Sequence, residues 1–338
     1  MGAGFATGQE LLQFFANYGI WSYFAALVAG LIITFITRQT AKLGYVLQTE
    51  SYEVALENIF GKFMAKIFDY ILIFFLYGLS VIMIAGTGSG LYDGFGVPTW
   101  LGTLITVIVL FFVMQLDFTN IVKVLGIITP FLIIAVLIIA GYNVISPTIP
   151  LSEVDQYTDI SRTPSGVWIW DAITYAGLVV ANSFSFMVII GGQSRNHFIS
   201  QRTALIGGLI FTGLVVLMTA GLVANLEVAN AAELPTLLLA DQIHPGVRIL
   251  MAVVMVGVIF NSVIGVLFPF LKRFTAEYSP KYKILLLISL VVAYLVSFIG
   301  FVDLVNFFYP IFGYIGMFIT IALFIRWIYN KTTNKKLL

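Results

Sequence analysis

The sequence predicts an all-α polytopic membrane protein. Hydrophobic residues make up 60% of the 338 residues, charged residues make up only 10%, and the mean hydropathy is +1.03. A soluble domain is about 45–50% apolar and about 25% charged, so this composition does not suit a water-soluble chain. The apolar residues also form runs of about 20, the length of helix that crosses a bilayer.

The same composition excludes several classes of protein. A nucleic-acid binder needs an excess of positive charge, but 17 Lys and Arg are balanced by 16 Asp and Glu. Because the chain has no cysteine, it has no disulfide framework, thiolate metal site or cysteine nucleophile. His197 and His244 fall in separate connections and do not predict a metal site. The lipid bilayer and a small-molecule substrate remain as partners, and we do not expect an enzyme.

Nine apolar runs are candidate spans, and polar residues or Pro and Gly residues separate most of them. In chain order they are residues 18–37, 63–91, 99–115, 119–145, 167–190, 203–225, 247–271, 284–299 and 304–329. A tenth apolar stretch, residues 2–15, is too short to cross as a regular helix. We number it helix 1, so that the spans are helices 2 to 10 of a single transmembrane domain, residues 1–338.

The distribution of Lys and Arg predicts the orientation of the spans. If successive spans alternate in direction, all but two of the 17 Lys and Arg fall on one side of the membrane, and the exceptions are Arg162 and Arg248. Positive charge is enriched in cytoplasmic connections, so we expect this side, with the C-terminus, to be cytoplasmic. The expected location is the plasma membrane.

The domain divides into two similar halves, residues 1–145 with helices 1–5 and residues 166–330 with helices 6–10. In each half a long connection separates the second and third helices; these connections are residues 38–62 and 226–246. Each half has five helices, an odd number, so the second half must insert upside down. This is the arrangement of transporters built from inverted repeats.

Both long connections are themselves predicted to contain helix. The piece 51–61 of the first connection is predicted as a short amphipathic helix, and the second connection is helix-prone around residues 233–241. This correspondence supports the division into repeats.

The first helix of each half carries signals for a broken backbone. Helix 1 contains Gly2, Gly4 and Gly8, and helix 6 contains Tyr-Ala-Gly at residues 175–177 and Asn-Ser-Phe-Ser at residues 182–185. Paired interruptions in matching positions predict a binding site near the middle of the membrane. The reason is that exposed backbone amide and carbonyl groups are tolerated at that depth only where they bind something.

The residues of helix 1 resemble a known family. The run GAGFATGQE at residues 2–10 is similar to the first helix of the YkvI-like membrane proteins, which belong to the amino acid–polyamine–organocation superfamily with the LeuT fold. The similarity in helix order covers essentially the whole chain and implies a LeuT-type 5+5 inverted repeat. Relatives carry a further half-helix before this motif, so we expect ten helices here, with the first truncated to its outer half.

The paired breaks predict where a substrate binds. Free amide groups at the start of the outer half of helix 1 are expected to face a substrate carboxylate. The alternative is that the small residues serve close helix packing and that the polar residues join helices. The substrate-binding candidates are Gly2, Ala3, Gly4, Tyr77, Tyr175, Gly177 and Asn182.

The resemblance also implies an ion site on helix 8. Asn261 and Ser262, seven residues before Pro269, resemble the polar pair that holds a sodium ion in LeuT-fold carriers. In those carriers backbone carbonyls complete the site, and here they would be those of Met1 and Val258. The alternative is that the pair hydrogen-bonds to carbonyls of its own helix. Beyond this sodium ion we expect no cofactor.

Three residues are candidates for gating or proton coupling. Glu10, with Gln9 beside it, lies in an apolar helix, where a carboxylate usually lines a watery path or meets a partner. It would attract a substrate ammonium, carry a proton, or clamp the outer helices by a hydrogen bond. A lysine on helix 5 replaces sodium in some proton-coupled relatives, but Lys123 is near a helix end, where its ammonium can reach the membrane surface. Asp69 also falls near a predicted helix end, where capping explains it.

From these observations we expect a secondary active transporter of a small amino acid or related organic amine, working as a symporter coupled to sodium through one site. The resemblance implies that helices 1, 2, 6 and 7 rock against helices 3, 4, 8 and 9. Two alternatives stay open at this point. One is a proton-coupled carrier that uses Lys123 or Glu10, and the other is a non-transporting membrane sensor or scaffold that keeps the fold.

Overall fold

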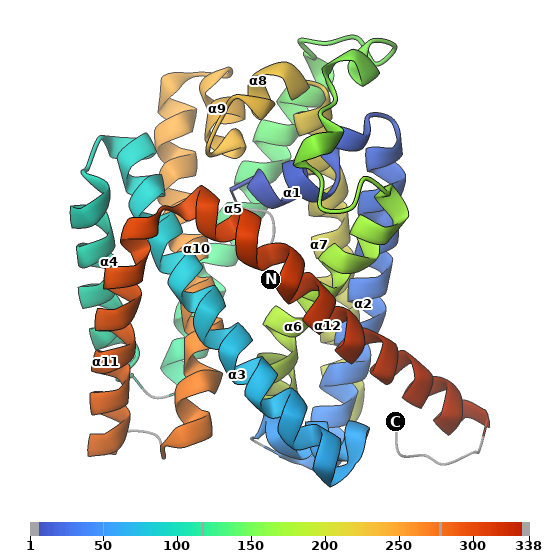
Figure 1. The fold of residues 1–338 in the computed structure, drawn as a ribbon, viewed down its shortest axis with the longest axis vertical. Helices are drawn as coiled ribbons and strands as arrows, with labels where there is room; N and C mark the ends of the chain where they lie inside the picture. The colour runs from blue at the N-terminus through green and yellow to red at the C-terminus, as the bar shows by residue number, and fades with distance from the viewer. Residues whose placement is uncertain (1–6, 50, 117, 277–278, 333–338) are drawn as a thin grey trace.

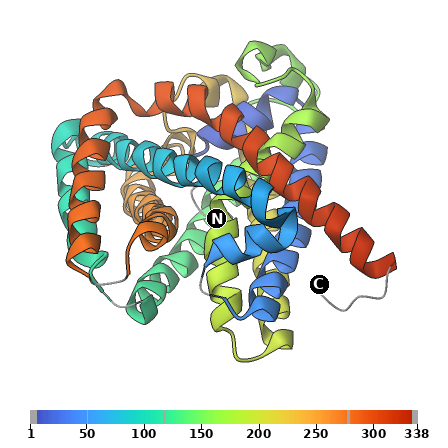
Figure 2. The same ribbon diagram turned by 60° about the horizontal axis from the view of Figure 1, so that its bottom comes forward.

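The computed structural model describes residues 7–49, 51–116, 118–276 and 279–332. These residues form helices and their connections, with no strand among them. Each of the nine predicted spans falls largely within a long helix, and Figures 1 and 2 show these helices packed into one bundle. The long helices are α2 (Trp21–Leu47), α3 (Tyr52–Phe95), α4 (Thr99–Val113), α5 (Phe118–Ile145), α6 (Trp168–Gln193), α7 (His197–Val223), α10 (Pro245–Phe274), α11 (Pro280–Val296) and α12 (Phe301–Thr332). Eight are long and apolar enough to cross a membrane, and α4 is shorter.

Helix 1 is described from residue 7 onward. Within the described residues it consists of α1 (Gln9–Phe14), followed by a single 3-10 turn, η2 (Ala16–Tyr18). Gly8 precedes α1 in the left-handed region, with φ 82°. The predicted break residues Gly2 and Gly4 lie outside the described residues.

The first long connection contains the predicted short helix. It forms the start of α3, where the hydroxyl of Ser51 caps the helix by accepting a hydrogen bond from the backbone N–H of Glu53. Gly61, with φ 75° and ψ 163°, interrupts the helical backbone and changes its direction. We call residues 52–60 the arm, because Gly61 separates them from the span that follows.

The second long connection forms α8 (Leu226–Asn230) and α9 (Pro235–Asp241) at the opposite end of the bundle. The α5–α6 connection, with the 3-10 helices η3 (Val154–Tyr157) and η4 (Ile160–Arg162), lies at the same end. Asn17 of η2 and Asn230 of α8 exchange amide hydrogen bonds of 3.1 and 3.0 Å, so these segments form one connected cover.

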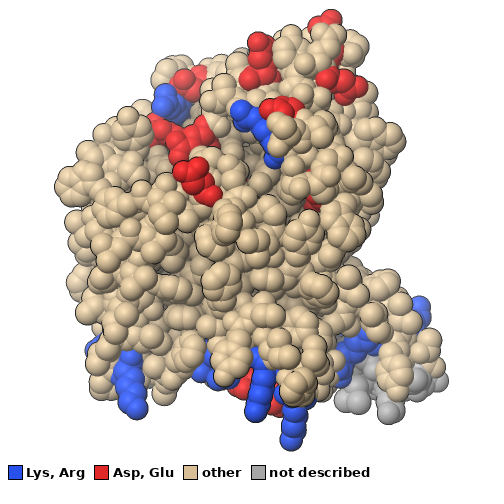
Figure 3. Space-filling model, viewed as in Figure 1, with Lys and Arg blue, Asp and Glu red and all other residues tan. Residues whose placement is uncertain are grey.

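Charge separates along the bundle. Figure 3 shows Lys and Arg concentrated at one end, the basic end, and Asp and Glu concentrated at the other, the acidic end. The two exceptional cations are paired at the acidic end, Arg162 with Asp159 and Arg248 with Asp241. Burial raises the pKa of Glu233 in the α8–α9 connection, and the neighbouring carboxylate of Asp93 raises it further.

The predicted break in helix 6 is wrong, because α6 is helical without interruption from Trp168 to Gln193. Its small residue is used for packing instead. A Cβ added at Gly177 would lie 2.4 Å from the carbonyl oxygen of Gly313 and 2.5 Å from the amide nitrogen of Met317, so α6 and α12 are in backbone contact there. The hydroxyl of Ser183 donates to the carbonyl oxygen of Val179 in its own helix at 2.9 Å. Close helix packing therefore explains Gly177, and a hydrogen bond within its own helix explains Ser183.

Two sets of helices make up the bundle. α2 packs against α6 and α7, and α6 also packs against α12. In the other set, α3 packs against α10 and α4. The two sets contact each other through α5, which packs against α7 and α10, and through α3, which packs against α6 and α12. This arrangement positions the site described next.

Candidate functional site

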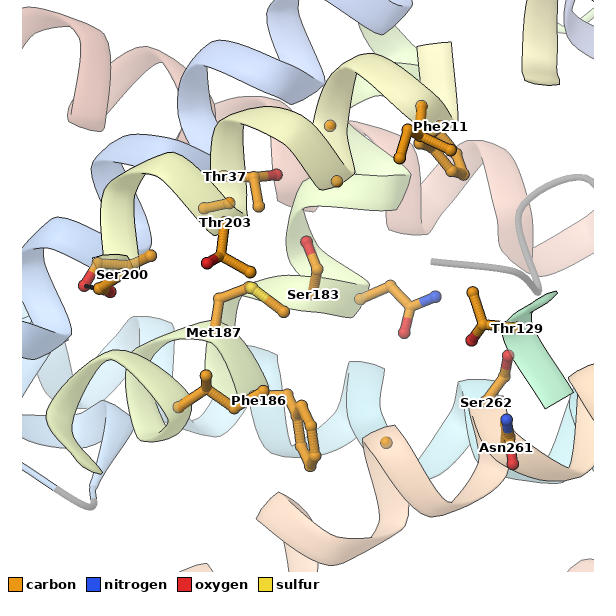
Figure 4. A pocket seen from close by; sticks show the side chains of 18 of the residues that line it. Thr37, Thr129, Ser183, Phe186, Met187, Ser200, Thr203, Phe211, Asn261 and Ser262 are labelled. Carbon is orange, nitrogen blue, oxygen red and sulfur yellow. Dashed lines mark hydrogen bonds between the residues drawn. The ribbon is translucent and has the colours of Figure 1, made fainter. Parts of the chain in front are cut away.

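A pocket of about 710 Å³ lies between the two sets of helices (Figure 4). Its lining comes from α2, α5, α6, α7 and α10 and reaches the α6–α7 connection, at the basic end. Most of the lining is apolar, and none of the lining side chains is ionisable. Its polar side chains are Thr37, Thr129, Asn182, Ser183, Gln193, Ser194, Ser200, Thr203, Asn261 and Ser262.

α10 contributes the predicted ion-binding residues to this pocket. Val258, Asn261 and Ser262 all line it, on successive turns of one helix face. The hydroxyl of Ser262 donates to the carbonyl oxygen of Val258 at 2.9 Å, so the bond to its own helix that we considered as an alternative does exist. That bond uses the hydroxyl proton and leaves the oxygen lone pairs as acceptors.

Another residue of the same helix, with a backbone carbonyl that lacks its usual helical partner, also belongs to the pocket. Gly265 lines it, and Pro269 stands four residues later. Proline has no N–H, so it does not donate the usual helical hydrogen bond to the carbonyl of Gly265. Sequence reasoning noted Pro269 but missed Gly265, although the spacing of four residues was the signal.

Opposite α10, α6 contributes Asn182, which among the described substrate-binding candidates is the one that lines this pocket. Phe186 and Met187 follow it one turn later and supply apolar surface. A small organic molecule in this place would meet amide and hydroxyl groups on one part of the wall and apolar side chains on another. That mixture is typical of a ligand pocket.

Two further hydroxyl residues were missed by sequence reasoning. Thr37 of α2 faces the pocket, and among the described residues its buried Oγ1 has no hydrogen-bond partner. Thr129 of α5 is drawn at the same side of Figure 4 as Ser262 and Asn261. Nothing in the local sequence marks Thr37, whereas Thr129 directly precedes Pro130 inside α5.

The other candidates lie elsewhere. Tyr77 donates its hydroxyl to the carbonyl oxygen of Ser289 on α11 at 2.9 Å and stacks on Phe270, outside the pocket lining. Gly177 faces α12. Lys123 is exposed and donates to Asn120 in its own helix at 3.4 Å. Met1, Gly2, Ala3 and Gly4 lie outside the described residues.

Glu10 and Tyr175 belong to a second cluster, towards the acidic end. Glu10 is fully buried and accepts hydrogen bonds from the hydroxyls of Thr7 at 2.6 Å and Tyr309 at 3.1 Å. Tyr175 is fully buried too, with its ring against Phe14 and Phe15 of helix 1. The side-chain oxygen of Gln9 is buried with no hydrogen-bond partner in the described part of the chain.

The helix arrangement is similar to that of known membrane transporters. Two mutants of the manganese transporter from Eremococcus coleocola superpose with TM-scores of 0.56 and 0.55, each covering 91% of this chain and 70% of the transporter at 15% identity. The same transporter in complex with an aromatic bis-isothiourea substituted compound gives a TM-score of 0.51. The chain is therefore an all-α polytopic membrane protein with a LeuT-like fold.

Sequence comparison adds two relatives from Bacillus subtilis (strain 168). The chain is 26% identical to the uncharacterized membrane protein YkvI over 94% of its own length and 90% of the relative. It is also 26% identical to the uncharacterized protein YyaD over 98% of its length and 94% of that relative. No family model matches the chain. These relatives confirm the resemblance to the YkvI-like membrane proteins.

Proposed function

We propose that the protein is a secondary active transporter that carries a small amino acid or related organic amine together with one sodium ion. The observation that carries this proposal is the position of the pocket. It lies between α2, α6 and α7 on one side and α10 on the other, which are the two groups expected to rock against each other. A binding site between two moving groups is what alternating access requires.

The ion is assigned from the oxygen ligands on α10. Val258, Asn261, Ser262 and Gly265 all line the pocket. The ligands would be the side-chain oxygens of Asn261 and Ser262 and the backbone carbonyl oxygens of Val258 and Gly265. They are hard, neutral oxygen ligands. A group of neutral oxygens suits a monovalent cation, because no carboxylate is present to balance a second charge.

The manganese transported by the structural neighbours is not favoured here. Manganese prefers sites with carboxylate, carbonyl and water ligands. In the part of the chain that the structure describes, no group of three or more His, Cys, Asp or Glu is arranged to hold a metal ion. The pocket lining has no ionisable side chain at all.

The substrate assignment combines the lining with the sequence-based expectation for helix 1. Asn182 and the apolar pair Phe186 and Met187 would contact the body of the substrate. The expectation that amides of Ala3 and Gly4 bind its carboxylate stays a prediction. Exposed Lys123 is outside the lining, which supports sodium rather than a proton on that lysine as the coupling ion.

The proposal includes an orientation. The basic end would be cytoplasmic in the plasma membrane, in keeping with the enrichment of positive charge on that side. Residues 1–145 and 166–330 would be the two inverted repeats. The pocket, which reaches the α6–α7 connection, would then be on the path to the cytoplasm.

Uptake into proteoliposomes tests the function. We expect wild-type protein to accumulate a labelled amino acid or amine when an inward sodium gradient is present, and not when potassium replaces sodium. Asn261→Ala and Ser262→Ala should each raise the sodium concentration for half-maximal uptake roughly tenfold, because each removes one oxygen ligand worth about 1.5 kcal/mol.

Thr106→Ala is a matched control. The hydroxyl of Thr106 donates to the carbonyl of Gly102 at 3.0 Å in α4, the same kind of bond that Ser262 makes, but outside the pocket. Its sodium dependence should equal that of wild type. Substrate binding without any uptake would favour the sensor or scaffold alternative, and loss of uptake in Lys123→Ala with sodium dependence intact at Asn261 and Ser262 would favour the proton-coupled carrier.

A further inference from the structure

Glu10 is a buried carboxyl group whose side-chain partners among the described residues are two hydroxyls. Its relative exposure is 0%, and its two oxygens accept hydrogen bonds from Thr7 at 2.6 Å and from Tyr309 of α12 at 3.1 Å. The hydroxyl of Thr7 is held in turn by the backbone N–H of Gln9 at 3.2 Å. This cluster is not part of the pocket lining.

No described cation compensates for a charge on Glu10. None of the salt bridges among the described residues involves it, and residues 1–6 contain no Lys, Arg or His. An ionised carboxylate buried without a cation is very costly, so such groups take up a proton instead. Two neutral hydroxyl donors do not replace a counter-ion.

The titratable groups that face Glu10 are phenols. Tyr309 donates to it, and Tyr175 is buried beside it on α6. Asp171, the carboxylate at the start of α6, accepts instead from the hydroxyl of Tyr18 at 2.5 Å. The other charged groups on the helices packed around α1 are His197 and Arg202 at the basic end of α7, Asp241 of α9 paired with Arg248, and Asp303, Arg326 and Lys331 of α12.

α9 covers the cluster from the acidic end. The backbone N–H of Thr236 donates to the carbonyl oxygen of Thr7 at 3.1 Å. The contact is close, since a Cβ on Gly8 would lie 2.8 Å from the hydroxyl oxygen of Thr236. α9 is a short helix in the α8–α10 connection and is not part of a long helix.

We propose that Glu10 is a proton-binding site of the gate at the acidic end, neutral while α9 covers it and able to exchange its proton with water when α9 withdraws. On protonation the carboxylate forms one O–H bond with a proton taken from water. In this protonated state the oxygen donates to the phenol oxygen of Tyr309 instead of accepting from it. On release the proton returns to water. The withdrawal of α9 rests on the proposed transport function, whereas the neutral state does not.

Infrared spectroscopy of the purified protein tests the neutral state directly. At neutral pH, wild type should show the C=O stretching band of a protonated carboxyl, with the small shift expected in heavy water. The band should be absent in Glu10→Gln and retained in Glu153→Gln, which changes an exposed glutamate in the α5–α6 connection. Equal spectra for wild type and Glu10→Gln would overturn the proposal.

Thermal unfolding gives a second measurement that needs no ligand. A carboxyl that is protonated in the folded protein and ionised in the unfolded chain makes stability fall as pH rises, until the folded form also loses the proton. Wild type should show this fall above the ordinary range of carboxyl titration, and Glu10→Gln should lack it. If Glu10→Gln does not fold, Tyr309→Phe decides: it removes a donor to the ionised form, so the fall should extend to higher pH. An unchanged profile in Tyr309→Phe would contradict the proposal.

Movement of α9 is tested with a thiol, because the chain contains no cysteine. Glu10→Cys in proteoliposomes of known orientation should react with a membrane-impermeant thiol reagent added at the acidic end, and not with reagent confined to the basic end. Lack of reaction from the acidic end would overturn the gate. If transport itself fails while the infrared band is present, the proposed function is wrong and the proton site stands.

Discussion

Arg273, in the last turn of α10, joins side chains that are far from it in the sequence. Its guanidinium donates to both carboxylate oxygens of Asp69, at 2.7 to 3.1 Å, and to Glu53 of the arm at 3.1 Å. Asp69 is only 4% exposed and lies inside α3, so the capping interpretation of this residue was wrong. A buried carboxylate with a two-pronged partner is a structural pair, and α3, α10 and the arm meet at it.

Removing the Arg273 guanidinium should lower the stability of the protein far more than removing a cation from the surface. We expect Arg273→Ala to destabilise the protein by about 3 kcal/mol, because it leaves Asp69 buried and unpaired. Thermal unfolding in detergent measures the effect, and adding Asp69→Asn to the variant should recover part of the loss. Arg162→Ala, which breaks an exposed pair with Asp159 at the acidic end, should change the midpoint little. Equal effects of the two single variants would contradict the assignment.

The arm depends on one backbone conformation. Gly61 has φ 75° and ψ 163°, a combination that is open to glycine and essentially closed to other residues. The turn places the arm where Glu53 contacts Arg273 of α10 and Asn58 accepts a hydrogen bond from Arg326 of α12. Two helices from the second half of the chain are thereby attached to the connection between α2 and α3.

Gly61→Ala tests the backbone conformation of the turn without a steric clash, since no atom lies within 4 Å of a Cβ at that position. The cost should be backbone strain alone, about 1–3 kcal/mol. Hydrogen exchange of the arm amides should increase as the arm loses its contacts. Gly213→Ala in α7 also meets nothing within 4 Å, but its backbone is helical, so it should be neutral or stabilising. Arm exchange that is unchanged in Gly61→Ala would show that the turn does not hold the arm.

At the scale of the whole molecule, the charges and the pocket are both distributed unequally between the two ends of the bundle. On the face shown in Figure 3, Lys and Arg concentrate at one end and Asp and Glu at the other, and a surface without charged side chains lies between them. The pocket lining reaches the basic end, whereas α8, α9 and the α5–α6 connection cover the acidic end. This asymmetry is consistent with the proposed transport function in a state that is closed at the acidic end.

The orientation of the two ends is open to a simple labelling experiment. Asp159→Cys lies in an exposed connection at the acidic end and Lys281→Cys at the start of α11 at the basic end. In intact cells, an impermeant thiol reagent should label only Asp159→Cys, and Lys281→Cys should react after the membrane is permeabilised. Labelling of both in intact cells would contradict the inverted arrangement, and the opposite pattern would reverse the orientation.

The sequence by itself determined the nine long helices of the described part of the chain, the helices inside both long connections and the separation of charge. These features depend on the length of apolar runs and on local residue preferences, which are readable along the chain. The resemblance to LeuT-fold carriers pointed to Val258, Asn261 and Ser262, and the polar run in helix 6 pointed to Asn182; all four line the pocket.

Only the tertiary structure decided which of these residues meet. Asn182 and the α10 residues share a pocket with Thr37 and Thr129, whereas Tyr175 joins Glu10 and Gly177 packs against α12. The signals read as a break in helix 6 came from residues that α6 uses for packing and internal hydrogen bonds. The physical reason is that these outcomes depend on the face of each helix that a side chain occupies and on which distant helix covers that face.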